Sequence, residues 1–192
     1  MDLILFAPGN AAAVFGSEEN DRETGGSLID NTWRNLDISQ ELGQCMELVS
    51  IQQGMKQQII TDATHSSRAS DRPIITELTC VKYVDKTSVR LYDMCLQAQP
   101  LSAGAQHPTK LYILRNSGDK TTNLMSIWLR DAIISDIQLQ TNQNDMPTEQ
   151  FKLKFTEILW RYTVQGTDTG ILGQQVAGWS LMHNRPITAF TA

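Results

Sequence analysis

The longest regular pattern of apolar and polar residues lies in Gln150–Val164, where the two kinds alternate with period two. Such alternation predicts a β-strand. The apolar side chains fall on odd-numbered residues within Phe151–Phe155 and on even-numbered residues within Ile158–Val164, so the apolar face would flip near Thr156–Glu157. We therefore expect one long strand with a β-bulge at that point, which would aim both halves at one core.

Shorter segments with strand character are separated by turn residues along the rest of the chain. They are Leu3–Phe6, Met46–Ile51 with a polar continuation to Ile60 and a kink or bulge at Gly54, Ile74–Val84, Leu111–Arg115, Thr122–Leu139 and Val176–Met182. One helix is expected from an N-cap at Thr87 or Ser88 to a point before Pro100. Its apolar side would hold Val89, Leu91, Tyr92, Cys95 and Leu96. One helix among seven or eight strands predicts a mainly β sandwich or barrel.

Two polar stretches interrupt the strands and are expected to be long loops, at about residues 10–44 and 61–73. The acidic, glycine-containing part at Gly16–Asn31 has too few apolar residues to fold by itself. Within the first stretch, Trp33–Leu42 is compatible with an irregular docked segment or with a poor helix. A chain of 192 residues requires only one core, so residues 1–192 are interpreted as a single domain.

Composition narrows the classes of partner. The chain has 41% hydrophobic and 19% charged residues and a formal net charge of -5. A nucleic acid or an anionic membrane would require a basic face, so neither partner is expected, and no apolar run is long enough for a membrane span. The N-terminal apolar run is short, lacks a positive flank and ends at Pro8–Gly9, so no signal peptide is expected.

Cysteine and histidine spacing gives no sign of a metal or disulfide framework. Cys45, Cys80 and Cys95 are an odd number at wide spacing, which favours reduced thiols and synthesis in the cytoplasm. His65, His107 and His183 are scattered, with no second ligand at metal-binding spacing. No metal site and no cofactor are expected.

Candidate catalytic groups have ordinary structural interpretations. A Ser-His-Asp site using Asp62 and His65 would need a rigid platform, whereas a polar loop does not hold a nucleophile in place. Asp131 and Asp136 would form an acid pair near Glu157, or would lie on a solvated face and pair with Arg130 or Arg161. The second interpretation is favoured, and no catalytic residue is assigned.

The strand aromatics Trp128, Trp160, Tyr162 and Trp179 suit a core role or a subunit contact, and core packing is the default. Long strands with open edges are also sites for pairing with a neighbouring subunit.

One segment resembles a known family. Val81–Ser88, with Lys82, Tyr83, Val84, Asp85 and Lys86 at its centre, is similar to the Thr-Lys-Tyr-Val-Asp-Lys-Ala-Ser segment that precedes the helix in the haemolysin-coregulated protein (Hcp) family, the tube protein of type VI secretion systems. Similar matches follow in order at Lys110–Arg115, at Glu149–Tyr162 and at Gly178–Trp179 of the closing strand. The family's Trp-Ser-Trp-Gly-Met is replaced here by Ile51–Met55, in which only the last two residues agree.

The resemblance implies a β-barrel of two sheets with one short α-helix, and six copies that close into a ring. It implies that rings stack into a tube that carries small effectors and contacts sheath, baseplate and spike proteins. Such a protein is cytoplasmic before firing, is then secreted without a signal peptide, and has no enzymatic activity.

Two sets of residues take roles from this resemblance. Gln52 would face the lumen of the tube. The loop at Asp62–Arg72 would reach the adjacent ring, with Asp62, His65, Arg68, Asp71 and Arg72 as its charged or titratable residues. Two alternatives stay open, namely a small β-sandwich hydrolase that uses His65 and a monomeric ligand-binding module.

Overall fold

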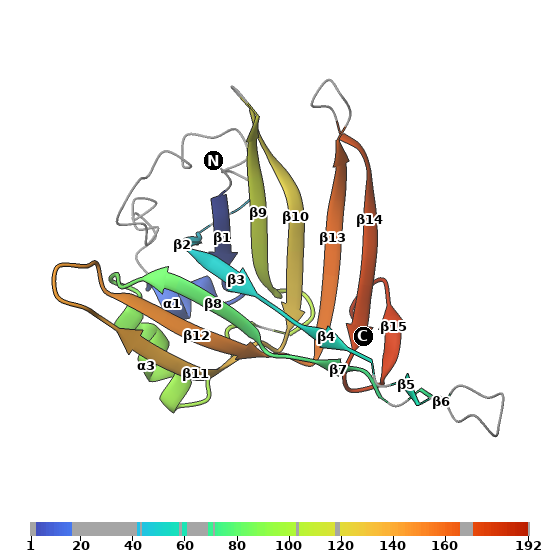
Figure 1. The fold of residues 1–192 in the computed structure, drawn as a ribbon, viewed down its shortest axis with the longest axis horizontal. Coiled ribbons are helices and arrows are strands. Elements are labelled where there is room, and N and C mark those ends of the chain that lie inside the picture. Colours follow the sequence, from blue (N-terminus) through green and yellow to red (C-terminus); the bar gives the residue numbers. More distant parts are fainter. Residues whose placement is uncertain are drawn as a thin grey trace.

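The structure is a computed structural model that describes residues 3–16, 42, 44–57, 59–60, 69–70, 72–102, 104–117, 120–165 and 171–191. Two large antiparallel sheets form the body of the molecule (Figure 1). The seven-stranded sheet contains, in spatial order, β15 (Arg185–Ile187), β14 (Ile171–Ser180), β13 (Glu157–Gln165), β10 (Lys120–Arg130), β9 (Thr109–Ser117), β1 (Leu3–Ala7) and β2 (Met46–Leu48). The four-stranded sheet contains β11 (Ile133–Gln140), β12 (Thr148–Lys154), β8 (Leu78–Tyr83) and β3 (Ser50–Gln52).

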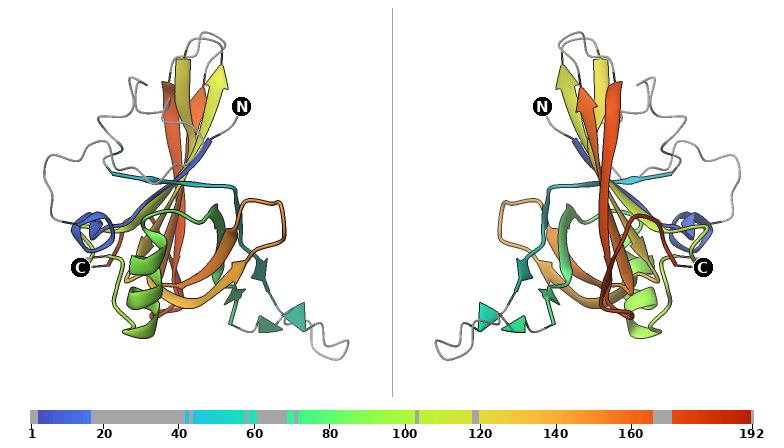
Figure 2. Two further views of the ribbon diagram at one scale, coloured as in Figure 1. Left: turned by 90° about the vertical axis from the view of Figure 1, so that its left-hand side faces the viewer. Right: turned by 90° about the vertical axis from the view of Figure 1, so that its right-hand side faces the viewer.

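Two small strand pairs extend from the body. They are β4 (Met55–Lys56) with β7 (Ile74–Ile75), and β5 (Ile59–Ile60) with β6 (Ala69–Ser70). Figure 2 shows these pairs running away from the large sheets as a narrow arm. The strand expected to continue through Gly54 with a kink or bulge is instead interrupted there, since β3 ends at Gln52 and β4 begins at Met55. With two large antiparallel sheets and two small strand pairs, the expected mainly β fold is confirmed.

The long strand predicted for Gln150–Val164 is wrong in one respect, because it is two strands in two different sheets. β12 ends at Lys154 and β13 begins at Glu157. Between them, the Thr156 N–H donates to the Arg130 carbonyl at 3.0 Å and its carbonyl accepts from the Leu181 N–H at 2.9 Å. The parity change thus marks a corner between sheets, not a bulge. The predicted consequence holds, because both strands contribute to one core.

The main core lies between the sheets. It includes Phe6 and Phe151, whose rings meet edge to face with centroids 5.6 Å apart, and it receives Leu153 and Ile158 from the two sides of the corner. A second cluster, Leu5, Ala7, Leu42, Cys45, Tyr112 and Leu114, covers part of the opposite face of the seven-stranded sheet. Burial raises the pKa of the Cys45 thiol to about 12, and a lowering effect of the nearby Lys110 charge is smaller.

Two helices flank the core in the described residues. α1 (Ala11–Phe15) lies within the stretch expected to be a loop, and its formation follows from the Asn10 side chain, which accepts from the Ala13 N–H at 3.3 Å, and from Val14, which enters the core. α3 (Ser88–Leu96) begins where the sequence predicts, after Thr87.

The apolar side predicted for α3 is partly wrong. Leu91 and Met94 face the core together with Ser88, whereas Val89 and Leu96 are 72% and 87% exposed. The helix is turned in this way because the Ser88 hydroxyl donates to the buried Glu149 carboxylate at 2.9 Å. A polar bond that hydrophobic periodicity cannot predict therefore determines which side of α3 is buried.

Glu157, at the corner, ties the chain end to the sheet. Its buried carboxylate accepts from Thr191 N at 3.0 Å, from Thr191 Oγ1 at 2.7 Å and from Arg130 Nη1 at 3.2 Å. Burial alone would raise the pKa of Glu157, but the hydrogen bonds from Thr191, Ser180 and Arg130 outweigh it and the pKa is lowered.

This shift predicts an acid-sensitive contribution to stability. The pKa of Glu157 in the folded protein lies below the ordinary value of 4.5. The ionised carboxylate therefore stabilises the folded protein fully above that value, and this stabilisation is lost as pH falls through the folded pKa. Glu157→Gln should lower the free energy of unfolding at pH 7 by about 2 kcal/mol and flatten its fall in acid. Urea unfolding between pH 7 and pH 3 measures both effects. Glu77→Gln, in an exposed ion pair with Lys154, is the control, and a variant at position 157 with the wild-type acid dependence would contradict the assignment.

Candidate functional site

A buried ion-pair network lies at the start of α3. Lys82 and Glu149 face each other in the register of β8 and β12, and both side chains are fully buried. The Lys82 ammonium lies 2.7 Å from Glu149 Oε1 and 3.0 Å from Asp85 Oδ1. It also donates to Ser88 Oγ at 3.2 Å and to the Tyr83 carbonyl at 2.9 Å. One cation is thereby surrounded by two carboxylates and two neutral acceptors.

The same network fixes the first turn of the helix. Asp85 Oδ1 accepts from the Thr87 N–H at 2.7 Å and from the Thr87 hydroxyl at 2.6 Å, while the Asp85 N–H donates to Ser88 Oγ at 3.0 Å. Burial, reinforced by the Glu149 carboxylate, raises the pKa of Tyr92 to about 12. The motif therefore joins a loop, a helix and two strands.

The remaining motif residues lie around this network. Tyr83 and Val84 are half-buried, and the Val84 N–H donates to the Pro147 carbonyl at 3.0 Å. Lys86 is exposed. The sequence singled out these residues through the resemblance, but gave no sign that Lys82 is buried, because an alternating pattern assigns a lysine to the solvated face.

Removal of the buried cation should be strongly destabilising. Lys82→Met leaves two buried carboxylates without a counter-charge, and such a loss costs about 3–5 kcal/mol. Lys152→Met is the matched control, because its partner Asp136 lies 2.8 Å away in a partly exposed pair, and little change is expected there. Chemical denaturation of both variants tests the contrast, and equal effects would show that the network contributes no more than a surface pair.

Gly178 and Trp179 lie in β14 against the corner strand β13. A Cβ atom at position 178 would lie 2.4 Å from Leu159 Cδ2 and 2.5 Å from the Ile158 carbonyl oxygen. Trp179 packs against the main core. The glycine is therefore required by close contact with backbone that cannot move aside.

Gly178→Ala should lower the free energy of unfolding by about 3 kcal/mol, because the added methyl group overpacks the sheet. Gly173→Ala lies in the same strand and has no atom within 4 Å of its added Cβ. It should change stability little. Thermal or urea unfolding of the pair provides the measurement, and a tolerated alanine at 178 would contradict the contact.

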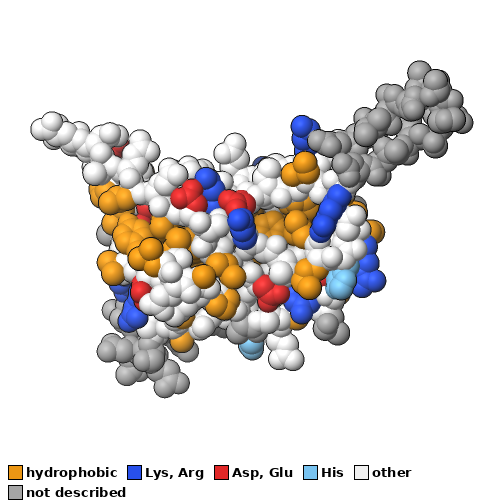
Figure 3. All heavy atoms as spheres, turned by 90° about the horizontal axis from the view of Figure 1, so that it is seen from below, with side chains coloured by type: hydrophobic (Ala, Val, Ile, Leu, Met, Phe, Trp, Pro, Cys, Tyr) orange, Lys and Arg blue, Asp and Glu red, His pale blue; other side chains and the backbone are white. Residues whose placement is uncertain are grey.

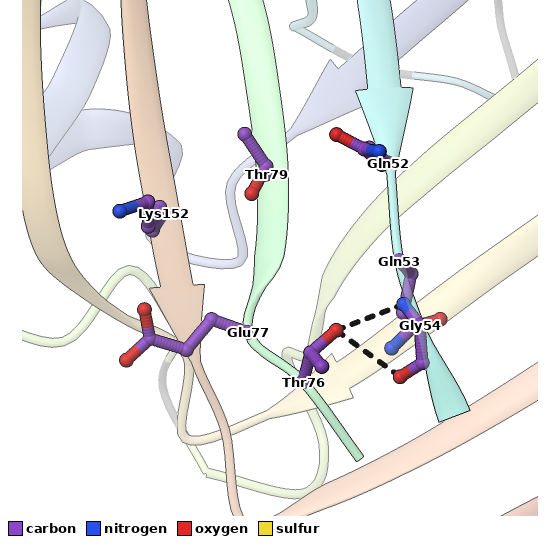
Figure 4. Close-up of a pocket in the computed structure, with 7 residues that line it drawn as sticks. All are labelled: Gln52, Gln53, Gly54, Thr76, Glu77, Thr79 and Lys152. Carbon is purple, nitrogen blue, oxygen red and sulfur yellow. Dashed lines mark hydrogen bonds between the residues drawn. The ribbon is translucent and has the colours of Figure 1, made fainter. Parts of the chain in front are cut away.

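A polar groove lies at the end of β3, where Gln52 was expected to face a lumen. β3 and β8 pair only as far as Gln52 and Thr79, after which the chains separate. They meet again where Thr76 Oγ1 accepts from the Gly54 N–H at 2.8 Å and donates to the Gly54 carbonyl at 3.1 Å. The groove has a volume of about 520 Å³ (Figure 4) and is lined by Gln52, Gln53, Gly54, Thr76, Glu77, Thr79 and Lys152. Its amides, hydroxyls and charged groups suit hydrogen bonding.

Of the charged residues in the predicted ring-contact loop, the structure describes Arg72. Its guanidinium donates to the Leu181 carbonyl, which anchors the base of the arm to the turn after β14. Asp62, His65, Arg68 and Asp71 lie outside the described residues.

The acidic residues Asp131 and Asp136 form ion pairs with basic neighbours. Asp131 lies 3.4 Å from Arg130, and Asp136 lies 2.8 Å from Lys152. The hypothesis that the two acids pair with each other is therefore wrong, and Arg130 is one of the basic partners that the sequence predicted.

Where the structure describes the chain, three or more His, Cys, Asp or Glu side chains nowhere gather as a metal site would require. The helices in these ranges are also too short or too polar to cross a membrane.

A cation–aromatic cluster was missed by the sequence analysis. Trp128 is half-buried on the face of the seven-stranded sheet that points away from the main core, with Lys110 Nζ 4.6 Å and Arg161 Cζ 4.3 Å from its ring centroid. The core-facing neighbours Ile127 and Leu129 are odd-numbered, so strand parity places Trp128 on the outer face. The position of Trp128 between two odd-numbered core residues was the sequence signal that could have predicted its outward orientation.

Comparison with known proteins decides the family. The family model described as "Type VI secretion system effector, Hcp" matches residues 39–162, which include β8, the start of α3 and the corner between β12 and β13. The chain belongs to the Hcp family. It is thus a tube protein of a type VI secretion system, and the resemblance found in the sequence is confirmed.

Solved Hcp structures share the fold over nearly the whole chain. A structure described as a type six secretion system protein has a TM-score of 0.71 at 18% identity and covers 97% of this chain and 100% of that one. Hcp1 from Salmonella typhimurium has a TM-score of 0.64 at 16% identity, with 97% and 99% covered, and Hcp2 from the same organism has 0.56 at 18%, with 95% and 98% covered. A comparison with curated protein sequences found no match.

Proposed function

We propose that six copies of this chain close into a ring, and that the rings stack into the tube of a type VI secretion system and carry small effectors. The observation that carries this proposal is the family match across the network at Lys82 and the sheet corner at Thr156. The sheet edges support it, since β11 and β3 are the outer strands of the smaller sheet. Edge strands offer backbone groups to a neighbouring chain.

The arm beyond β4 and β7 is the proposed contact between rings. Residues 61–68 link β5 to β6 in the sequence, and Arg72 holds the base of the arm against the body. The resemblance to the family implies that Asp62–Arg72 contacts the adjacent ring. The narrow shape of the arm in Figure 2 favours that role.

The lumen is proposed to lie beside Gln52. Gln52, Thr79 and Lys152 come from β3, β8 and β12 and line one polar groove (Figure 4). The amides, hydroxyls and paired ammonium of this wall can form hydrogen bonds with many protein surfaces. Such contacts do not require a deep apolar pocket in the wall. Such a wall suits transient contact with cargo.

The chain is proposed to act through assembly alone, without catalysis, in contact with sheath, baseplate and spike proteins. It would reside in the cytoplasm until it is secreted. The hydrolase alternative predicts an activity that is lost in His65→Ala while assembly is unchanged.

Native mass spectrometry of the purified protein tests the proposal. A ring should appear at six times 21.5 kDa. Electron microscopy should then show tubes that become shorter in a variant with Arg68→Ser and Arg72→Ser. A strict monomer at high concentration would refute the ring, and unchanged tube length in the variant would refute the role of the arm.

A further inference from the structure

α3 presents an exposed face with two apolar residues and one acid. Val89, Asp93 and Leu96, here called the α3 surface, lie within about 60° of one another around a helix that turns 100° per residue. All three are exposed, and Asp93 accepts from Gln97 Nε2 at 2.6 Å. Figure 3 shows that hydrophobic side chains gather at the molecular surface seen from below, the side on which α3 lies. Exposed Val and Leu on one helix face indicate a contact surface.

The second surface has the complementary character. Lys110, Trp128 and Arg161, here called the Trp128 surface, come from the adjacent strands β9, β10 and β13. Among the residues that the structure describes, no carboxylate lies within ion-pair distance of Lys110 or Arg161. The Trp128 Nε1 atom is buried without a hydrogen-bond partner. Two uncompensated cations around a tryptophan, in a chain of net charge -5, favour an acidic and partly apolar partner.

The two surfaces lie on opposite sides of the seven-stranded sheet. The buried side of α3 packs into the main core through Leu91 and Met94, on the face of the sheet that carries Ile127 and Leu129. Trp128 alternates with those two residues and points the other way. The surfaces therefore cannot meet within one copy.

We propose that the α3 surface of one copy docks on the Trp128 surface of the next copy. Asp93 pairs with Lys110 and Arg161, while Val89 and Leu96 pack beside the Trp128 ring. Because the two surfaces differ, the contact is head to tail and repeats around a ring. The inference rests on the proposed ring and names the side chains that hold it together. Arg90 lies about 100° around the helix from Val89, at the margin of the contact.

A charge exchange tests the contact in the full-length protein. Asp93→Arg alone and Lys110→Glu with Arg161→Glu should each raise the dissociation constant of the ring at least about tenfold, because like charges then face each other. The chain that carries all three changes should regain rings. Leu96→Glu should also weaken them, and since Leu96 is 87% exposed this variant tests the surface without disturbing the core. Sedimentation velocity across a concentration series measures the ring, and circular dichroism verifies that each variant is folded.

Asp145→Arg is the matched control, because Asp145 is an exposed acid in the turn between β11 and β12 and belongs to neither surface. Rings unaffected by the changes at positions 93, 110 and 161 would overturn the inference and leave the proposed function standing. Loss of rings in the separate variants without recovery in the combined one would also overturn it. A wild-type chain that stays monomeric would instead overturn the proposed ring.

Discussion

A buried lysine is the constraint on which the rest of this fold depends. Transfer of an ammonium or a carboxylate out of water costs several kcal/mol per ion, so Lys82 is tolerated only where its partners are fixed within hydrogen-bond distance. Glu149 supplies one partner across the β8–β12 ladder, and Asp85 supplies the other from the loop before α3. The register of two strands and the first turn of the helix are thereby determined together.

That constraint also decides which side of α3 reaches the solvent. Ser88 is drawn inward because it bridges Lys82 and Glu149, and the rotation that buries Ser88, Leu91 and Met94 turns Val89 and Leu96 outward. Two apolar side chains are thus exposed as a consequence of the polar bonds that Ser88 makes on the inner side of the helix. The packing of the main core and the exposure of the α3 surface follow from the same few bonds.

The sequence identifies the strand segments because period-two alternation is a local property, but sheet membership is not local. Thr122–Leu139, predicted as one strand, is therefore divided into β10 and β11 in different sheets. A bulge and a corner both shift side-chain parity by one residue, and the bonds that distinguish them at Thr156 come from Arg130 and Leu181, more than twenty residues away in either direction. The start of α3 after Thr87 was predictable because it is marked by local polar residues, although the capping oxygen is supplied by Asp85 and not by Thr87. The buried side of α3 was not predictable, because it depends on the distant Glu149. Lys82 was identified only by resemblance, and its burial depends on Glu149, which is 67 residues distant.

The bonds around Gly54 explain how the fold tolerates the unusual sequence at Ile51–Gln53. The family's aromatic residues are replaced at Ile51–Gln53, yet the backbone there is held by Gly54 and Thr76 through three hydrogen bonds, including Thr76 N–H to the Gly54 carbonyl at 2.9 Å. A Cβ atom at Gly54 would approach Thr76 Oγ1 to 3.3 Å, so a small residue suits this position. Ile51 packs against the main core and the Gln53 side chain accepts from Trp160 Nε1 at 3.2 Å, so among the residues before Gly54 it is Gln52 that can change the chemistry of the groove at little cost to the fold. A change at Gln52 can therefore alter the polar lining of the groove while the backbone bonds between Gly54 and Thr76 keep its shape.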